Sequence, residues 1–452
     1  MTAVSGVKML MSDPRVAIPS MALPLAVAIL IQNVNGMADL LWVSWLGGSA
    51  VGGVGLAYPV YGSIVGVGNG LAVGVAAAIA RCVGRRDRDG ASRSAGQSLF
   101  LGVVFSLLVT LVCMLTMDPL ISWFDSGEAG TEALAYLIPV FSFCVFITLG
   151  SIMSGILRGE GAARASMMIQ AAGAMVNIVL DPILIYGLGM GVAGAAWATV
   201  IAGAASMMLG LMCYRPRNRM YVSLRARDLI PDARLSRDIL VVGLPQAAEY
   251  VVMFSINIPM NYIIVGVAGA DTVGVYTAGW RVAYLALVPA QAYSGAVVSV
   301  CSAEYSARRS GMMSMAYRFA VRRSVLHTVY LSVVLAVLAY PICCVFTAAD
   351  DLIYLRGSMF LLMMCLAAML PFMSQVFVCS GFLQALKHSG TALLSSLVRN
   401  IVMVSAYAAA AAVFATAASI WISMAAVEIF GGLLMAGLAL MYVRRFVRDN
   451  PE

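Results

Sequence analysis

The stretch that decides the fold runs from Ser166 to Cys213 and reads SMMIQAAGAMVNIVLDPILIYGLGMGVAGAAWATVIAGAASMMLGLMC. Its only acidic or basic side chain is that of Asp181. About 20 consecutive apolar residues suffice for one membrane-spanning helix, so the stretch predicts two. An ionised carboxylate inside such a helix is costly unless something compensates its burial. The stretch therefore predicts both a membrane fold and a functional position within it.

The whole chain has the composition of a membrane protein. Of its 452 residues, 62% are hydrophobic and 11% are charged, against about a quarter charged in a soluble domain. The apolar residues form blocks of roughly 20 to 30, and no series of alternating strands typical of a transmembrane barrel is present. The first block is too long for a signal peptide and is interpreted as the first helix. The fold class is predicted to be an all-α membrane protein with twelve transmembrane helices. The predicted spans are 16–45, 51–80, 95–117, 132–157, 163–186, 192–214, 238–267, 272–303, 321–346, 354–384, 390–414 and 419–443.

The distribution of basic residues predicts the orientation of these spans. The termini and the even-numbered connections hold 25 of the 28 Lys and Arg residues, whereas Arg356 is the one in the odd-numbered connections. Connections rich in Lys and Arg stay on the cytoplasmic side. We therefore expect a multi-pass protein of the cell membrane with both termini in the cytoplasm. The formal charge of +7 reflects this topology, and the basic connections are interpreted as solvated. Nucleic acid is not expected as a partner, and the lipid bilayer is.

An internal repeat predicts the domain organisation. A shift of 221 residues places Pro24 on Pro245 and Gly48 on Gly269, and it also aligns Gly53 with Gly274. We expect an N-terminal six-helix lobe at 1–214, a basic cytoplasmic linker at 215–237, and a C-terminal six-helix lobe with a short tail at 238–452. Six spans return the chain to its starting side, so the lobes would be related by a pseudo-twofold axis along the membrane normal. Chance matching of glycines in a Gly-rich chain is the alternative.

Four polar side chains predict a cation site in the N-terminal half. Asp39 and Asp181 lie in the outer halves of their helices, Asn177 shares a helix face with Asp181, and Thr199 begins the next span at a similar depth. Two close carboxylates in a medium of low dielectric constant resist joint ionisation, so such a pair can take up a proton. With both carboxylates charged, the same oxygens can instead hold Na⁺. The alternative is that each aspartate only hydrogen-bonds a kinked backbone. The 221-residue shift places Met260 on Asp39, so the site belongs to one half alone.

The remaining ionisable residues within the spans allow fewer conclusions. Glu249 is interpreted either as a second carboxylate for substrate or as a structural partner of Arg281. Arg399 and Glu428 are predicted to form a buried pair. The two histidines, His327 and His388, are isolated, and His327 is expected to be a hydrogen-bonded core residue. Nine cysteines show no CxxC spacing and are interpreted as small buried side chains. With no nucleophile–base pair and no metal cluster, an enzyme is not expected.

Long motifs in the chain resemble the multidrug and toxic compound extrusion (MATE) family. Residues 42–60 read WVSWLGGSAVGGVGLAYPV, and residues 157–199 contain LRGEG, NIVLDP and GVAGAAWAT, like the LRG-x-G, N-x-x-x-D-P and G-x-x-G-A-A-x-A-T motifs of the family. The likeness extends over nearly the whole chain. The sequence departs from the family at VCSAEYSA (300–307), which lacks the glycines of that loop, and at Ser154, where an asparagine is common.

The resemblance implies an exporter within the multidrug/oligosaccharidyl-lipid/polysaccharide exporter superfamily. Such transporters move organic, often cationic, drugs or toxic metabolites outward by alternating access in exchange for H⁺ or Na⁺. In the DinF-like and archaeal branch, the coupling site would consist of Asp39, Asn177, Asp181 and Thr199, with no other cofactor. The substrate and gating candidates are Tyr136, Pro24, Glu249, Arg281 and Ser154, and a monomer is expected. A lipid-linked oligosaccharide flippase on the same fold is the alternative.

Overall fold

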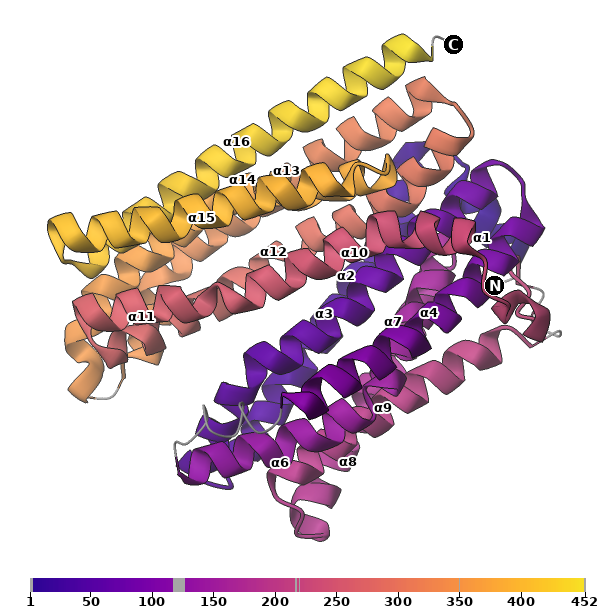
Figure 1. Ribbon diagram of the computed structural model, residues 1–452. Helices are drawn as coiled ribbons and strands as arrows, with labels where there is room; N and C mark the ends of the chain where they lie inside the picture. The colour runs from indigo at the N-terminus through magenta and orange to yellow at the C-terminus, as the bar shows by residue number, and fades with distance from the viewer. Residues whose placement is uncertain (1–2, 117–126, 216–217, 219, 349, 451–452) are drawn as a thin grey trace. The chain divides into compact units, whose positions relative to one another are not determined.

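The computed structural model describes residues 3–116, 127–215, 218, 220–348 and 350–450, and these contain helices and no strands (Figure 1). Eleven helices are long and apolar enough to cross a membrane. A twelfth span arises when α6 (Glu128–Ser142) and α7 (Cys144–Gly159), bent by 59° at Phe143, are counted together. The predicted all-α membrane fold with twelve spans is thus confirmed. The predicted end of the third span, residue 117, lies outside the described residues.

The first compact unit contains the chain up to Phe254, together with Val298–Arg308. Asp13 caps its first long helix, since the carboxylate accepts a hydrogen bond from the backbone N–H of Arg15 at 2.8 Å. Besides α6 and α7, the elements that lie wholly within this unit are α1 (Ala3–Leu10), α2 (Pro14–Ser44), α3 (Gly48–Gly84), α4 (Arg88–Leu115), α8 (Ala163–Pro182), the π-helical turn η1 (Ile183–Gly187), α9 (Val192–Cys213) and the 3₁₀ turn η3 (Ala226–Leu229).

The second unit contains Ser255–Val297 and Arg309–Glu452. Two helices are divided between the units, namely α10 (Ala233–Ser255) and α12 (Ala270–Ser306). The boundaries between the units along the chain therefore fall within helices, whereas the sequence predicts lobes separated by the 215–237 linker. The arrangement of the lobes stays a prediction. The other elements of the second unit are α11 (Asn257–Ala268), α13 (Ser310–Phe346), the 3₁₀ turn η4 (Asp350–Leu355), α14 (Arg356–Ala385), α15 (Ser389–Phe414) and α16 (Ala417–Asp449).

Glycines allow the helices of the first unit to approach closely, as is usual between membrane helices. In this unit α3 packs against α4, α6 and α7, and α2 packs along α8. A Cβ atom added at Gly155 of α7 would lie 2.3 Å from the carbonyl oxygen of Ala72 in α3. One added at Gly70 would lie 2.5 Å from the backbone nitrogen of Ala247 in α10. These contacts are with backbone atoms, which have little room to move.

The internal repeat reappears in the backbone at the ends of four helices. The residues that follow α3 and α12, Arg86 and Arg308, have φ angles of 59° and 57° and are 222 positions apart. Gly161 after α7 and Lys387 after α14 have φ angles of 82° and 64° and are 226 positions apart. A left-handed residue at this place ends a helix by satisfying its last carbonyl groups. The two halves thus end corresponding helices in the same way, at spacings close to the 221-residue shift.

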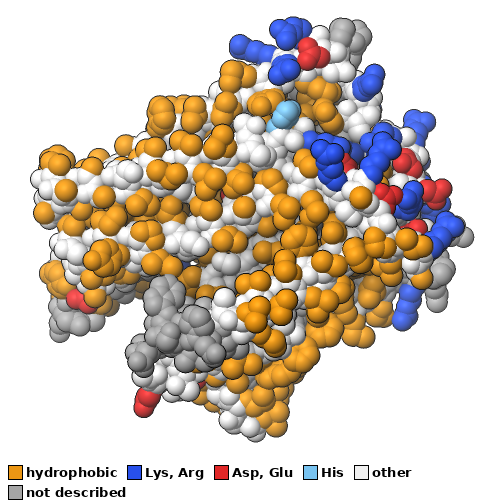
Figure 2. Space-filling model, viewed as in Figure 1, with side chains coloured by type: hydrophobic (Ala, Val, Ile, Leu, Met, Phe, Trp, Pro, Cys, Tyr) orange, Lys and Arg blue, Asp and Glu red, His pale blue; other side chains and the backbone are white. Residues whose placement is uncertain are grey.

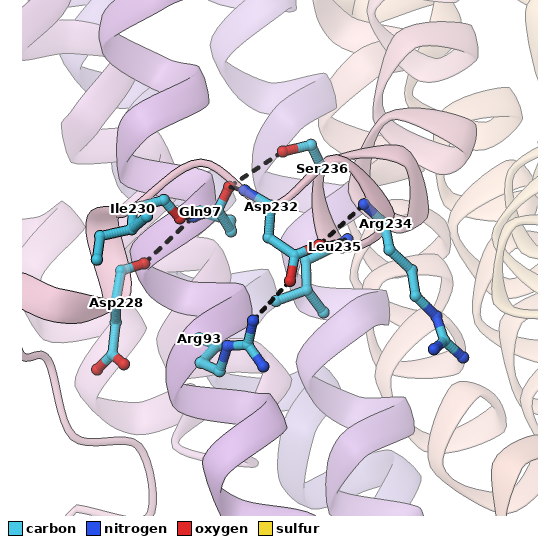
Figure 3. Close-up of polar contacts among 8 residues, drawn as sticks. All are labelled: Arg93, Gln97, Asp228, Ile230, Asp232, Arg234, Leu235 and Ser236. Atoms are coloured by element: carbon cyan, nitrogen blue, oxygen red, sulfur yellow. Dashed lines mark hydrogen bonds and ion pairs between the residues drawn. The ribbon is translucent and has the colours of Figure 1, made fainter.

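Hydrogen bonds anchor part of the basic linker to α4 within the first unit (Figure 3). The side-chain oxygen of Gln97 accepts a hydrogen bond from the backbone N–H of Asp232 at 2.9 Å, and Arg93 pairs with the carboxylate of Asp232 at 2.6 Å.

In Figure 2, hydrophobic side chains cover much of the visible flanks of the helices, and Lys and Arg gather near helix ends. Arg81 differs from the predicted solvated basic residues, because it is 1% exposed and binds Asp238 at 2.9 Å. Its buried charge is compensated by this ion pair.

A buried carboxylate ties the end of α7 to Tyr214 and to Val222 of the linker. Glu160, directly after α7, accepts hydrogen bonds from the Tyr214 hydroxyl at 2.7 Å and from the backbone N–H of Val222 at 3.0 Å. Burial raises the pKa of Glu160 to about 7, although these hydrogen bonds act in the opposite direction. This carboxylate therefore titrates near neutral pH.

The second unit confirms one predicted pair and corrects one prediction. Arg399 of α15 and Glu428 of α16 form the expected ion pair, with 2.8 Å between Nη1 and Oε2. His327 does form a hydrogen bond, which Nδ1 donates to the carbonyl oxygen of Arg323 at 2.6 Å, but it is exposed and not a core residue. Its ring lies beside that of Tyr293 of α12, with 5.8 Å between the centroids, and still stays exposed, which an isolated histidine in an apolar run does not reveal.

The glycine contacts predict a steep penalty for a single methyl group at Gly155. We expect Gly155→Ala to lower the free energy of unfolding by about 1–3 kcal/mol, because the methyl group would overlap the backbone of α3. Gly55→Ala, on an exposed face of α3 with nothing within 4 Å, is the matched control and should gain up to about 1 kcal/mol from helix propensity. Thermal unfolding in detergent measures both. Equal effects of the two substitutions would contradict close α3–α7 packing.

Glu160 predicts a pH-dependent component of stability. Because its pKa is raised by folding, its contribution is fully present below the unfolded value of 4.5 and is lost as the pH rises through about 7. We expect the stability of Glu160→Gln, relative to wild type, to improve by about 2 kcal/mol between pH 5 and pH 8. Thermal unfolding across this range tests the slope, with exposed Asp89→Asn as the control. A difference that does not vary with pH would show that Glu160 does not titrate there.

Candidate functional site

Polar side chains form a continuous hydrogen-bonded cluster between α2 and α8. The Asn35 side-chain amide donates to the side-chain oxygen of Asn177 at 2.6 Å. Asn177 in turn donates from Nδ2 to Oδ1 of Asp181 at 3.2 Å, and the carboxyl group of Asp181 interacts with that of Asp39. Asn177 and Asp181 are 2% and 0% exposed. The cluster thus joins two carboxyl groups and two amides in the interior of the first unit.

The local structure explains why these residues meet. Asn35 and Asp39 are four residues apart on α2, as are Asn177 and Asp181 on α8, so each pair shares one helix face. The packing of α2 along α8 brings the two faces together. Pro182 follows Asp181 at the end of α8, and the chain continues as the π-helical turn η1. Such turns are common at functional sites, and here one lies beside the buried carboxyl group.

Two tyrosines and a threonine surround the carboxyl pair. Tyr136 of α6 is 7% exposed, and its ring meets that of Tyr61 of α3 edge to face, with 5.8 Å between the centroids. Both hydroxyl groups interact electrostatically with Asp39, and that of Tyr136 also interacts with Thr199 of α9. The hydroxyl group of Thr199 also donates to the carbonyl oxygen of Ala195 at 3.1 Å. Tyr61 was not predicted from the sequence, where nothing separates it from other apolar-face aromatics.

The chemistry of the cluster suits a positively charged ligand. Two close carboxylates repel each other, and a proton or a cation bound between them removes this repulsion. Three buried side-chain oxygens have no hydrogen-bond partner, namely Oδ1 of Asn35, Oδ1 of Asp39 and Oδ2 of Asp181. A buried acceptor without a donor costs about 1–3 kcal/mol, so each is a place where a cation or a donor would be stabilised. Among the described residues, no group of three His, Cys, Asp or Glu side chains is placed to hold a transition metal.

A second polar cluster lies further along the same two helices. The Gln32 amide donates to Gln170 Oε1 at 2.8 Å, and the Gln170 amide donates to Ser154 Oγ at 2.9 Å. Ser154 is also hydrogen-bonded to Ser166 at 2.7 Å. Of these residues the sequence analysis singled out only Ser154. The signal that could have identified the other residues of this cluster is the spacing of polar side chains along α8. These side chains follow one another at close to whole helical turns, at Ser166, Gln170, Asn177 and Asp181.

The structure therefore brings together Asp39, Asn177 and Asp181, with Thr199 and Tyr136 next to them. Pro24 is buried within α2, which continues through it as one helix. Glu249 lies on α10 in the first unit and Arg281 on α12 in the second, so their pairing stays a prediction. The roles assigned to all of these residues likewise stay predictions.

Comparison with known proteins places the chain among transporters. The family model MatE matches residues 24–183 and 245–409, two segments whose first residues are 221 positions apart. The probable multidrug resistance protein NorM of Thermotoga maritima is 28% identical over 344 residues, which are 74% of this chain and 72% of that protein. The multidrug export protein MepA of Staphylococcus aureus is 27% identical over 242 residues, 53% of each chain.

Solved transporter structures resemble this chain over almost its full length. The outward-facing conformation of a multidrug resistance MATE family transporter of the MOP superfamily is 28% identical, with a TM-score of 0.93 over 98% of this chain and 99% of that one. A MOP superfamily transporter from Pyrococcus furiosus, whose binding pocket is described as having reverse polarity and suggesting a different function, is 27% identical with a TM-score of 0.93 over 98% of each chain. The sequence motifs, the helical fold and the family model agree, and the chain belongs to the MatE family of membrane transporters.

Proposed function

We propose that this protein is a secondary active antiporter that exports organic compounds in exchange for H⁺ or Na⁺. The observation that carries the proposal is the Asp39–Asp181 pair, whose carboxyl groups interact and have two buried oxygens without hydrogen-bond partners. A buried acid with vacant acceptor oxygens can gain and lose a positive ion, which is what a coupling site must do. The multidrug exporters NorM and MepA among its relatives support organic compounds as the exported class.

The energetics of the exchange are adequate for export. One elementary charge moving inward down a potential of 100 mV releases about 2.3 kcal/mol. At about 1.4 kcal/mol for each factor of ten, this sustains a substrate gradient of roughly 50-fold. Binding of the ion must favour one conformation over the other, because a ligand with equal affinity for both shifts neither. Its release on the inner side then resets the transporter.

The proposal includes the location and the partners of the protein. It would act as a monomer in the cell membrane, with both termini in the cytoplasm, on amphipathic and often cationic drugs or toxic metabolites. Arg93 and Arg81 would then lie on the cytoplasmic side, together with their partners Asp232 of the linker and Asp238 directly after it. Tyr136, Ser154, Glu249 and Arg281 are the candidates for contact with substrate, and Pro24 for bending of α2.

The buried charged side chains support a flippase less well than a cation-coupled exporter. A site for a lipid pyrophosphate needs cationic side chains that are free to bind it. Arg399 of the second unit is instead bound to Glu428 at 2.8 Å, and Arg81 of the first unit to Asp238 at 2.9 Å. An acidic cluster at α2–α8 would repel a pyrophosphate and attract a cation.

Neutralising either carboxyl group should abolish coupling. We expect Asp39→Asn and Asp181→Asn to lower the rate of ethidium export at least tenfold in proteoliposomes with an imposed pH or Na⁺ gradient, because an amide takes up neither ion. Applying the two gradients separately identifies the coupling ion. Exposed Asp89→Asn, which alters an acid outside the cluster, should export at the wild-type rate.

Normal export by both cluster variants would refute the proposed coupling site. Export by wild type that persists without either gradient would refute secondary active transport itself. Flipping of a pyrophosphate-linked lipid in the same vesicles, without export of ethidium, would instead favour the flippase.

A further inference from the structure

Asn35 occupies a place in the cluster that differs from that of the other amide. Its Nδ2 donates to Asn177 at 2.6 Å, while its own side-chain oxygen is buried and has no partner. Asn33, two residues earlier on α2, instead donates to the carbonyl oxygen of Ile29 at 2.8 Å and stays with its own helix. An acceptor that is held in place and left vacant is expensive to bury, unless a ligand occupies it in another state of the protein.

Asn177 has no such vacancy. Its side-chain oxygen accepts from Asn35 at 2.6 Å, and its side-chain nitrogen donates to Asp181 at 3.2 Å. Both ends of this amide are therefore used within the cluster. One of the two lone pairs of the Asn177 oxygen is already engaged by Asn35, whereas both lone pairs of the Asn35 oxygen are vacant.

We propose that the side-chain oxygen of Asn35 is a ligand of the cation-loaded state, and that Asn177 is a positioning residue that orients Asn35 and Asp181. This inference rests on the proposed coupling function of the Asp39–Asp181 pair. An amide oxygen is a permanent acceptor without charge. It coordinates Na⁺ directly, or it accepts the O–H of a protonated carboxyl group. In both cases the vacant oxygen meets the positive charge that the pair takes up.

The same geometry places the coupling proton. Oδ1 of Asp181 accepts from the Asn177 amide, so a proton on that oxygen would oppose a donor that is already there. The oxygens without partners, Oδ1 of Asp39 and Oδ2 of Asp181, have no such conflict. A proton bound on one of these can be donated to Asn35, which adds one hydrogen bond to the loaded state alone. Asn35 would thereby favour loading over release.

Two substitutions of Asn35 separate a ligand from a purely structural residue. Asn35→Ala removes both the vacant oxygen and the donor to Asn177. Asn35→Asp keeps the shape and supplies oxygen, but it removes the donor. If the oxygen is a ligand, Asn35→Asp should bind the cation at least as tightly as wild type and Asn35→Ala should bind it about tenfold more weakly, the loss typical of one hydrogen bond to a charged group. If Asn35 only supports Asn177, the two variants should be equally impaired.

The test uses the purified full-length protein in nanodiscs. Equilibrium binding of radioactive Na⁺ gives the Na⁺ arm, and a pH titration of tryptophan fluorescence gives the proton arm, because Trp42 lies one turn of α2 beyond Asp39. For Asn35→Ala we expect a tenfold weaker Na⁺ affinity, or a titration midpoint about one pH unit more acidic, in whichever arm wild type responds. Asn33→Ala is the matched control and should behave as wild type in both arms.

The outcomes distinguish this inference from the proposed function. Wild-type cation binding by Asn35→Ala, or equal impairment of Asn35→Ala and Asn35→Asp, would overturn the role of Asn35, while loss of binding in Asp39→Asn and Asp181→Asn would leave the coupling site standing. Normal binding by those two aspartate variants, or no response of wild type in either arm, would overturn both. If Asn35→Ala fails to fold, the cation affinity of Asn35→Asp is compared with those of wild type and Asn33→Ala. This comparison then decides whether Asn35 is a ligand.

Discussion

Burial of two carboxyl groups between α2 and α8 is the constraint on which the rest of the first unit depends. Asp181 is fully buried and interacts with Asp39, so the pair is stable only with a proton, a cation or a set of fixed donors beside it. Asn177 supplies one such donor. Elsewhere in the unit the helices pack closely, as the approach of Gly155 in α7 to the backbone of Ala72 in α3 shows. The first unit is therefore polar where the cluster would bind an ion and tightly packed elsewhere.

The second unit shows what the corresponding position becomes without that constraint. The residue 221 positions after Asp39 is Met260, which is 2% exposed and lies in an apolar core with Tyr276 and Trp421. The sulfur of Met260 accepts a weak hydrogen bond from the Tyr276 hydroxyl at 3.9 Å, and the rings of Tyr276 and Trp421 stack with 5.6 Å between their centroids. The repeated fold thus carries a pair of carboxyl groups in one half and an aromatic core at the corresponding place in the other. This difference is expected if the protein needs only one ion-binding site.

The sequence predicted the helices well because a membrane span is defined by length and hydrophobicity, which are read directly from composition. It also identified Asp39, Asn177 and Asp181, because charge or amide groups stand out in apolar runs. It missed Asn35 and Gln32, whose importance depends on which face of α2 meets α8. It missed the burial of Arg81 and Glu160, because basic and acidic residues beside a glycine-rich turn look solvated until the partners, Asp238, Tyr214 and Val222, are placed by tertiary packing.

The polar face of α8 continues from Asp181 back to Ser166, and its chemistry is informative. Fifteen residues of helix rise about 22 Å, most of the thickness of a hydrocarbon core. Over that length, the described contacts with α2 and α7 are made by amides and hydroxyls, with acids confined to one end. Neutral groups can be buried at low cost when they are hydrogen-bonded, whereas every additional acid would need its own compensation. A single carboxyl pair can therefore change its charge while the remaining contacts along α2 and α8 stay intact, so the effect of one bound ion is concentrated at the C-terminal end of α2.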